Sequence, residues 1–188
     1  MEYSIIDEGK KLTILDKTIT ELPEIKDIKI LDCEGCTLLT CIPNIKGLKE
    51  LNCPSCTSLT YIPNIKDLKL LDCQYCTKLN SIPNIKSLKE LYCEGCTKLT
   101  SIQNIVGLEE LYCGGCTSLI SIQNIKSLKV LICKYCTLLP SIPNIEGLKY
   151  LDCRVCTSLT SIPQDLDLIL NQNLYYLGCP WIKPDKER

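Results

Sequence analysis

The hydrophobic residues of this chain recur in units of 20 residues. Each unit follows the pattern L-x-x-L-x-C-x-x-C-T-x-L-x-x-I-P-N-I-x-x with few changes. Seven consecutive units show it, and they begin at Ile28, Leu48, Leu68, Leu88, Leu108, Leu128 and Leu148. A fixed period of this length is typical of a solenoid, in which each unit buries its apolar face against its neighbours. The sequence therefore predicts an extended repeat protein.

Alternation within each unit predicts a short β-strand. In the segment "LKELNC" at 48–53, alternate side chains point to opposite sides of an extended chain, so Leu51 and Cys53 fit the inward face. The unit is too short to hold a long helix as well, and Ile62 and Pro63 favour an extended or 3-10 return path on the convex side. The predicted fold class is a solenoid of about nine strands in one curved parallel β-sheet on the concave face, with little α-helix.

Both ends of the chain depart from the repeat pattern, as the caps of a solenoid do. We predict an N-terminal cap with an irregular first repeat at 1–27 and seven repeats at 28–167. A C-terminal cap with a final half-repeat is predicted at 168–188. The segment "YSII" near the N-terminus is expected to add a short hairpin.

The flanking segments align with the cysteine positions of the repeats. In the irregular first repeat, Ile14 takes the place of the first cysteine and Lys17 that of the second. Near the C-terminus, after an insertion of six residues, Cys179 is expected in the first place and Ile182 in the second. Neither end is thus predicted to hold a complete Cys-x-x-Cys pair.

Two outward positions of each predicted strand vary between units, while the inward positions stay nearly constant. Toward the C-terminal half they gather apolar and aromatic side chains. Rigid aromatic residues on a concave sheet are typical anchors for a protein partner, although cross-strand tyrosine pairs also stabilise a sheet by themselves. The candidate partner-binding residues are Leu70, Tyr92, Tyr112, Val130, Ile132, Tyr135, Tyr150 and Tyr176.

Charge and hydropathy argue against a nucleic acid or a membrane as partner. The 188 residues carry a net charge of −1 with both signs interspersed, and acidic residues stand beside much of the lysine that recurs near the start of most units. No segment has the apolar length of a signal peptide or a membrane span. We therefore predict an intracellular, cytoplasmic protein in a compartment that keeps thiols reduced.

The sequence lacks the groups of residues that common catalytic sites need. Without histidine, Ser-His-Asp and Cys-His arrangements are impossible, and no glycine-rich phosphate loop occurs. Neighbouring carboxylates such as Glu109 and Glu110 are expected to face outward on an open sheet instead of into a cleft. The sequence therefore predicts a protein that is not an enzyme.

The 16 cysteines allow three hypotheses. As free thiols they would be small core residues. As thiolates, two pairs from neighbouring repeats would supply the four sulfurs of a zinc or iron–sulfur site, although burying their negative charge is unfavourable. Disulfides between equivalent positions would have to span about 4.8 Å, which is longer than the usual Cβ separation. The candidate metal ligands are Cys33, Cys36, Cys53, Cys56, Cys73, Cys76, Cys93, Cys96, Cys113, Cys116, Cys133, Cys136, Cys153, Cys156 and Cys179.

The unit resembles the leucine-rich repeat family, whose frame is L-x-x-L-x-L-x-x-(N/C)-x-L. In the second unit these positions are held by Leu48, Leu51, Cys53, Cys56 and Leu59. The short repeat and its trailing I-P-x-I resemble repeats of bacterial effectors, and the cysteine-dense pattern is similar to repeat proteins of giant DNA viruses of amoebae. The resemblance covers roughly residues 12 to 182. It implies a solenoid that binds a protein on its concave face.

Two functions follow from these patterns. The first is an interaction module for a protein partner, with no cofactor and no nucleic acid or membrane contact. The second is a metal or iron–sulfur protein that uses the stacked Cys-x-x-Cys pairs of successive repeats. If the resemblance to viral proteins reflects the origin of the chain, the host cytoplasm or the virion is the expected location.

Overall fold

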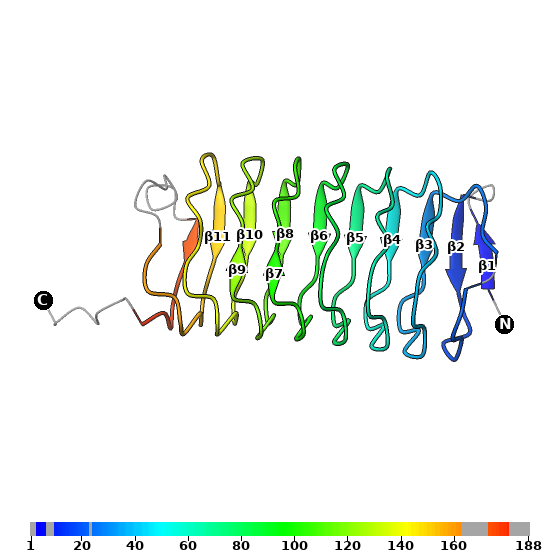
Figure 1. Ribbon diagram of the computed structural model, residues 1–188, viewed down its shortest axis with the longest axis horizontal. Helices are drawn as coiled ribbons and strands as arrows, with labels where there is room; N and C mark the ends of the chain where they lie inside the picture. Colours follow the sequence, from blue (N-terminus) through cyan, green and yellow to red (C-terminus); the bar gives the residue numbers. More distant parts are fainter. Residues whose placement is uncertain (1–2, 7–9, 23, 163–172, 181–188) are drawn as a thin grey trace, which may run out of the picture.

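The computed structural model describes residues 3–6, 10–22, 24–162 and 173–180. This part of the chain consists of β-strands and turns, without a helix. The strands stand side by side along the long axis of the molecule, with β1 at one end and β12 at the other (Figure 1). We call each circuit of the chain, from one strand to the next strand of the main sheet, a coil. The predicted solenoid is confirmed.

The main sheet contains ten of the described strands. All of its strands from β2 onward run parallel, and equivalent residues of successive coils lie opposite one another, as Leu91 does with Leu111. The strands are β1 (Tyr3–Ile6), β2 (Lys11–Ile14), β3 (Ile30–Asp32), β4 (Glu50–Asn52), β5 (Leu70–Asp72), β6 (Glu90–Tyr92), β8 (Glu110–Tyr112), β10 (Val130–Ile132), β11 (Tyr150–Asp152) and β12 (Leu174–Tyr175).

The core is a stack of leucine, isoleucine and cysteine side chains. In β6 and β8 the central residues, Leu91 and Leu111, are fully buried, whereas the residues on either side of them are only partly buried. Backbone hydrogen bonds continue the contact between coils beyond the strands, as in the 2.8 Å bond from the Cys93 N–H to the Tyr112 carbonyl. The alternation read from the sequence thus places the predicted residues inside.

A second sheet, which the sequence analysis did not predict, lies on the return path. It pairs β7 (Ser101–Ile102) with β9 (Ser121–Ile122) in parallel. These are the two coils in which glutamine replaces the proline of the repeat. The Gln123 N–H donates to the Ile102 carbonyl at 2.9 Å, a bond that proline lacks the hydrogen to make. The predicted sheet of the repeats is confirmed, and in these two coils the extended return segments pair with each other as well.

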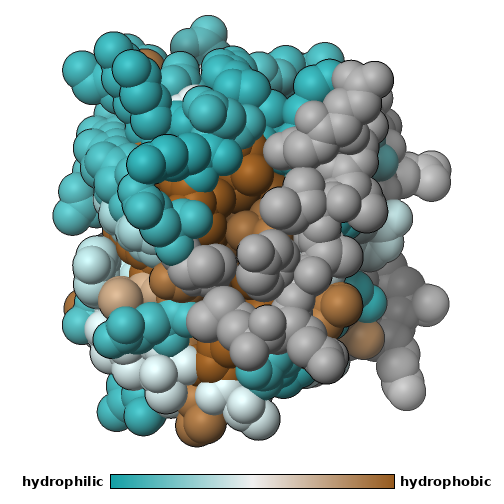
Figure 2. Space-filling view, turned by 90° about the vertical axis from the view of Figure 1, so that its right-hand side faces the viewer, coloured by the Kyte–Doolittle hydropathy of each residue, from teal (hydrophilic) through white to brown (hydrophobic). Residues whose placement is uncertain are grey.

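The N-terminal end of the solenoid is covered by a hairpin. β1 pairs antiparallel with β2, which confirms the predicted capping hairpin. Figure 2 looks onto this end of the molecule and shows hydrophobic residues near its centre, with hydrophilic residues along much of the rim. β1 therefore extends the sheet at this end, while hydrophobic residues remain visible beside it.

The first coil holds the equivalents that the sequence predicted for it. Leu12 lies opposite Leu31, so Ile14 occupies the position of Cys33 and is fully buried. Lys17 takes the second cysteine position, and its Nζ donates to the Ile14 carbonyl at 2.7 Å. A lysine thus satisfies a backbone carbonyl at the end of the stack, where its long side chain still reaches water.

The last half-repeat is displaced by three residues from the predicted alignment. Leu174 lies opposite Leu151, so Tyr176, not Cys179, takes the position of the first cysteine. Cys179 takes the second position, and its N–H bonds to the Tyr176 carbonyl at 3.2 Å, as the N–H of each second cysteine bonds to the first. The insertion is therefore three residues long, not six. Ile182 and the predicted domain boundary at 168 lie outside the described residues.

One turn position after each strand of the main sheet from β3 onward requires the left-handed backbone region. Several coils place glycine there, which adopts positive φ without strain. Other side chains pay a steric penalty in this region, and a β-branched one pays most. The non-glycine residues at this position are Ser55 (φ 60), Tyr75 (φ 57), Tyr135 (φ 62) and Val155 (φ 60).

Replacing Val155 with glycine is expected to raise the free energy of unfolding by about 1 kcal/mol, because relief of backbone strain exceeds the added entropy of the unfolded chain. Urea unfolding followed by circular dichroism measures the change. The opposite substitution is the control: Gly95→Ala should destabilise the protein, since Gly95 has φ 69 and an added Cβ would lie 2.5 Å from Cδ1 of Tyr75. A lower urea midpoint for Val155→Gly would show that the turn is unstrained.

Candidate functional site

The outward side chains of the main-sheet strands β3, β4, β5, β6, β8, β10 and β11 form a continuous surface, which we call the sheet face. The first and third residues of each strand point to this side, because the central leucine points into the core. Since the strands are in register, these residues form two columns that run along the solenoid. The predicted site residues can be placed along these columns.

Two tyrosines stack at the middle of the sheet face. The rings of Tyr92 and Tyr112 have centroids 4.6 Å apart and planes 12° from parallel. Each hydroxyl donates to a carboxylate of its own strand, Tyr92 to Glu90 at 3.1 Å and Tyr112 to Glu110 at 2.9 Å. Burial, together with the hydrogen bond to Glu90, raises the pKa of Tyr92 to about 12, so its hydroxyl stays protonated at neutral pH. Stacking and hydrogen bonding hold both rings in one orientation.

Apolar residues continue the surface toward the C-terminal end. Ile132 follows Tyr112 in the same column, and Val130 lies opposite Tyr150 in the other. We call the five residues Tyr92, Tyr112, Val130, Ile132 and Tyr150 the tyrosine patch. The sequence predicted these residues, together with Tyr135 on the adjoining turn, as one patch, and the register of the strands places the five on adjacent strands of the sheet face.

Three other predicted residues lie apart from the tyrosine patch. Leu70 is separated from Val130 by two glutamates in its column. Tyr135 lies on the turn after β10, where its side chain is exposed and its N–H bonds to the Arg154 carbonyl at 2.8 Å. Tyr176 occupies a cysteine position beyond the end of β12, not the outward column that was predicted for it.

The corrected alignment adds a tyrosine that sequence reasoning missed. Tyr175 lies opposite Asp152, in the column that contains Tyr92 and Tyr112, and its ring packs on Tyr150 with centroids 5.4 Å apart. Arg154 lies over the same ring and forms a two-point ion pair with Asp152. The leucine spacing did not reveal Tyr175, because Leu174 and Leu177 repeat the L-x-x-L spacing of Leu148 and Leu151, whereas the strand pairing places Leu174 opposite Leu151.

Carboxylates surround the stacked tyrosines. Asp72 precedes Tyr92 in its column, while Glu90 and Glu110 fill the neighbouring column. Burial raises the pKa of Asp72. In the part of the chain that the structure describes, no lysine or arginine forms an ion pair with Asp72, Glu90 or Glu110. The sheet face is therefore negatively charged around its aromatic centre.

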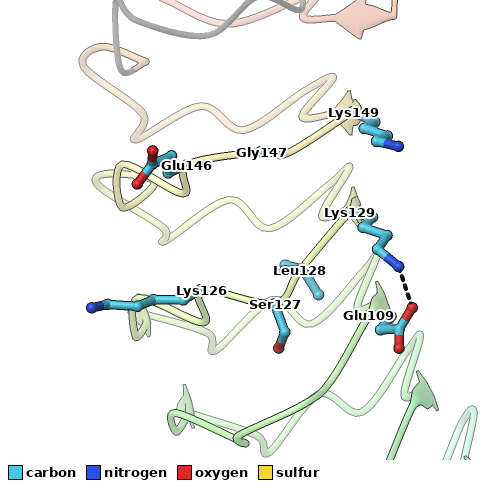
Figure 3. Close-up of a pocket in the computed structure, with 8 residues that line it drawn as sticks. All are labelled: Glu109, Lys126, Ser127, Leu128, Lys129, Glu146, Gly147 and Lys149. Carbon is cyan, nitrogen blue, oxygen red and sulfur yellow. Dashed lines mark hydrogen bonds and ion pairs between the residues drawn. The ribbon is translucent and has the colours of Figure 1, made fainter.

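Within the described residues, three of the six lysines at the second position of the repeats form ion pairs with acidic side chains. Glu109 stands in this column and pairs with Lys89 at 2.8 Å and with Lys129 on its other side. These hydrogen bonds lower the pKa of Glu109 to about 2. Figure 3 shows Lys129 directed at Glu109, beside a shallow hollow that Gly147 and Ser127 help to line. The lysine edge thus contains exposed ion pairs at Lys49, Lys89 and Lys129.

The cysteines form two columns inside the core. First and second cysteines of every complete pair are fully buried, and Cys41 lies apart with partial exposure. From the second complete coil onward, each second cysteine donates its S–H to the carbonyl of the first cysteine one coil earlier. Cys116 bonds to the Cys93 carbonyl in this way at 3.1 Å, and Cys136 to the Cys113 carbonyl at 3.1 Å. The second cysteine is therefore a hydrogen-bond donor that links neighbouring coils.

Thiol chemistry in the first column is suppressed. The neighbouring thiol and burial raise the pKa of Cys93 and of Cys113 well above the ordinary value, so both are protonated at neutral pH. Within the described ranges, no three cysteine or acidic side chains gather in an arrangement that could hold a metal ion. Each first cysteine has one thiol from the following coil beside it, and that thiol donates to a backbone carbonyl.

Comparisons with known proteins bear on the fold. No protein-family model matches the sequence, and curated proteins gave no match. The leucine-rich repeat domain of the type III effector XopL resembles the structure with a TM-score of 0.59 and 22% identity, over 81% of this chain and 69% of that one.

Two further solved structures resemble this one at a TM-score of 0.50. A leucine-rich repeat protein of T. pallidum is 20% identical over 74% of this chain and 87% of its own length. One from Eubacterium ventriosum is 19% identical over 99% of this chain and 52% of its own. No helix of the described chain is long and apolar enough to span a membrane. The likeness to viral proteins stays a prediction, and the topology and these neighbours together identify the fold as a leucine-rich repeat solenoid.

Proposed function

We propose that the protein is a non-enzymatic interaction module that binds a protein partner on its sheet face. The observation that carries the proposal is the stacked pair of Tyr92 and Tyr112, which presents two rigid rings outward from the middle of the sheet. Preordered aromatic residues lose little entropy on binding and dominate many protein interfaces. One known structure with this fold is the leucine-rich repeat domain of the type III effector XopL.

The chemistry of the sheet face favours a partner segment with positive charge. The aromatic pair is apolar, and Asp72, Glu90 and Glu110 around it have no cationic partner among the described residues. A lysine or arginine beside an apolar side chain would complement both features, and arginine would also stack on the rings. A binding experiment tests this function. It compares how much partner is captured by the intact protein and by the Tyr92→Ala and Tyr112→Ala double variant.

For the cysteines we propose a structural role without a metal. Support comes from the S–H bonds to backbone carbonyls, which use the thiol proton that a metal would displace. The intracellular location predicted from the sequence stays a prediction.

Elemental analysis of anaerobically purified protein tests the cysteine assignment. We expect less than about one tenth of a metal equivalent per chain together with all 16 thiols titratable after unfolding. An absorption spectrum recorded on the same sample separates iron–sulfur clusters from zinc, because zinc thiolates absorb only in the ultraviolet. One or more equivalents of zinc or iron per chain would contradict the proposal.

A further inference from the structure

The two cysteine columns are staggered, so that sulfurs meet between coils. Each first cysteine faces the second cysteine of the following coil, and we call such a couple a staggered thiol pair. The spacing is 23 residues in six pairs and 26 in the last, where the insertion adds three. The pairs are Cys33 with Cys56, Cys53 with Cys76, Cys73 with Cys96, Cys93 with Cys116, Cys113 with Cys136, Cys133 with Cys156, and Cys153 with Cys179.

Two observations place the members of each staggered thiol pair side by side. The Sγ of the second cysteine lies 3.0 to 3.2 Å from the carbonyl oxygen of the first in all seven pairs. In six pairs the neighbouring thiol is the main cause that raises the pKa of the first cysteine, and in the Cys153 pair burial and the neighbouring thiol raise it together, so the two sulfurs lie near each other. The same geometry therefore repeats along the whole solenoid.

The two cysteines of one Cys-x-x-Cys turn lack the bond from a thiol to a carbonyl that joins the staggered pairs. Within one Cys-x-x-Cys turn, Cys93 and Cys96 are joined by a backbone bond, from the Cys96 N–H to the Cys93 carbonyl at 3.3 Å. The Cys96 S–H instead donates to the Cys73 carbonyl, and the Cys116 S–H donates to the Cys93 carbonyl, each at 3.1 Å. The staggered arrangement thus couples different coils, not the two cysteines that are close in sequence.

We propose that the staggered thiol pairs are sites of disulfide formation, so that oxidation by a small disulfide such as oxidised glutathione joins each coil covalently to the next. Seven bonds use 14 of the 16 cysteines, which leaves Cys36 and Cys41 as thiols. Cys36 is left over because its partner position in the first coil is held by Ile14. No second sulfur is available there.

The reaction consumes one glutathione disulfide per bond. A protein thiolate attacks one glutathione sulfur, which forms a mixed disulfide and releases the first glutathione. The paired thiolate then attacks the protein sulfur of that mixed disulfide, which forms the Sγ–Sγ bond and releases the second. The two thiol protons end on the two released glutathiones, and the two protein sulfurs are oxidised as the glutathione disulfide is reduced.

Burial decides when the bonds form. Both thiols of the central pairs are inaccessible in the closed solenoid, and the raised pKa of the first cysteine keeps it protonated. Glutathione therefore reacts before neighbouring coils have closed. We expect the bonds to form during refolding and only slowly in the folded protein.

The test is refolding of the full chain from urea with a mixture of reduced and oxidised glutathione. Remaining thiols are alkylated, and the protein is digested and analysed by mass spectrometry. Seven bonds remove two hydrogens each, so the unalkylated chain should lose about 14 Da relative to the reduced chain. Linked peptides should join cysteines of adjacent coils, with Cys36 and Cys41 alkylated. Bonds within single Cys-x-x-Cys turns, or no loss of mass, would overturn the proposal.

A single substitution separates the pairings. Cys93→Ala should free Cys116 for alkylation and leave Cys96 bonded to Cys73; alkylation of Cys96 in place of Cys116 would overturn the proposal. Circular dichroism of the variant refolded in reductant shows whether it has folded. If it has not, Cys153→Ala near the end of the stack provides the same test, with Cys179 as the thiol expected to become free and Cys156 as the thiol expected to stay bonded.

Discussion

Replacing Leu111 with alanine is expected to lower the free energy of unfolding by about 3 to 5 kcal/mol. The side chain is fully buried at the centre of β8, between Leu91 of β6 and Leu131 of β10. In a solenoid each coil packs only on its neighbours, so a cavity here weakens the contact with the coil on either side. Urea unfolding in reducing buffer, followed by circular dichroism, measures the loss.

An exposed residue near the same core provides the control. Lys98 lies on the turn that follows β6 with its side chain in solvent, and Lys98→Ala should change stability by less than about 0.5 kcal/mol. If Leu111→Ala costs less than about 1 kcal/mol, the strands are packed more loosely than the buried fraction indicates, and the central premise of a tight leucine core fails.

Removing both stacked tyrosines is expected to weaken partner binding by a factor of about 30 or more, because an aromatic anchor pair at an interface contributes about 2 kcal/mol or more. The double variant Tyr92→Ala and Tyr112→Ala loses one ring stack, which contributes about 0.5 to 1.5 kcal/mol to stability, so the protein should stay folded. The experiment identifies a partner by cross-linked capture with the intact protein. It then compares the affinity of that purified partner for both proteins by calorimetry.

A tyrosine elsewhere on the surface provides the matched control. Tyr61 is 50% exposed on the return path, away from the sheet face, and Tyr61→Ala should leave affinity unchanged. Neutralising Glu90 and Glu110 to glutamine should weaken binding most at low salt if the partner segment is basic. Equal affinity of the double tyrosine variant and the intact protein would rule out the tyrosine patch. An unchanged result for the glutamine variants would rule out only the basic partner.

Much of the fold could be predicted because the period itself is structural information. An insertion-free repeat of 20 residues places equivalent residues opposite one another, so Leu51 and Cys53 predicted the inward column of every coil. The irregular first coil also followed the pattern, since Ile14 and Lys17 keep the spacing of a cysteine pair. The C-terminal half-repeat did not follow the predicted alignment. The residues around Cys179 differ from the repeat, so the sequence alone allows Cys179 in either the first or the second cysteine position.

The candidate site was predicted in part for the same reason. Residues that share a column, such as Tyr92 and Tyr112, follow from the repeat alone. Tyr175 was missed because its position in the column depends on the length of the insertion before it. The pairing of β11 with β12 shows that length, and the composition of the segment does not. The pairing of β7 with β9 was missed as well, although the exchange of proline for Gln103 and Gln123 in the sequence marks its position.

By itself, the sequence determined a stack of parallel strands with leucine and cysteine inside and a variable face outside, because a regular repeat leaves one way to bury its apolar side chains. Only the tertiary structure decided which sulfurs meet. The offset between successive coils brings Cys93 to Cys116 instead of to Cys96, and it aims each second thiol at a carbonyl of the preceding coil. That offset arises from hydrogen bonds between coils, which no single repeat contains.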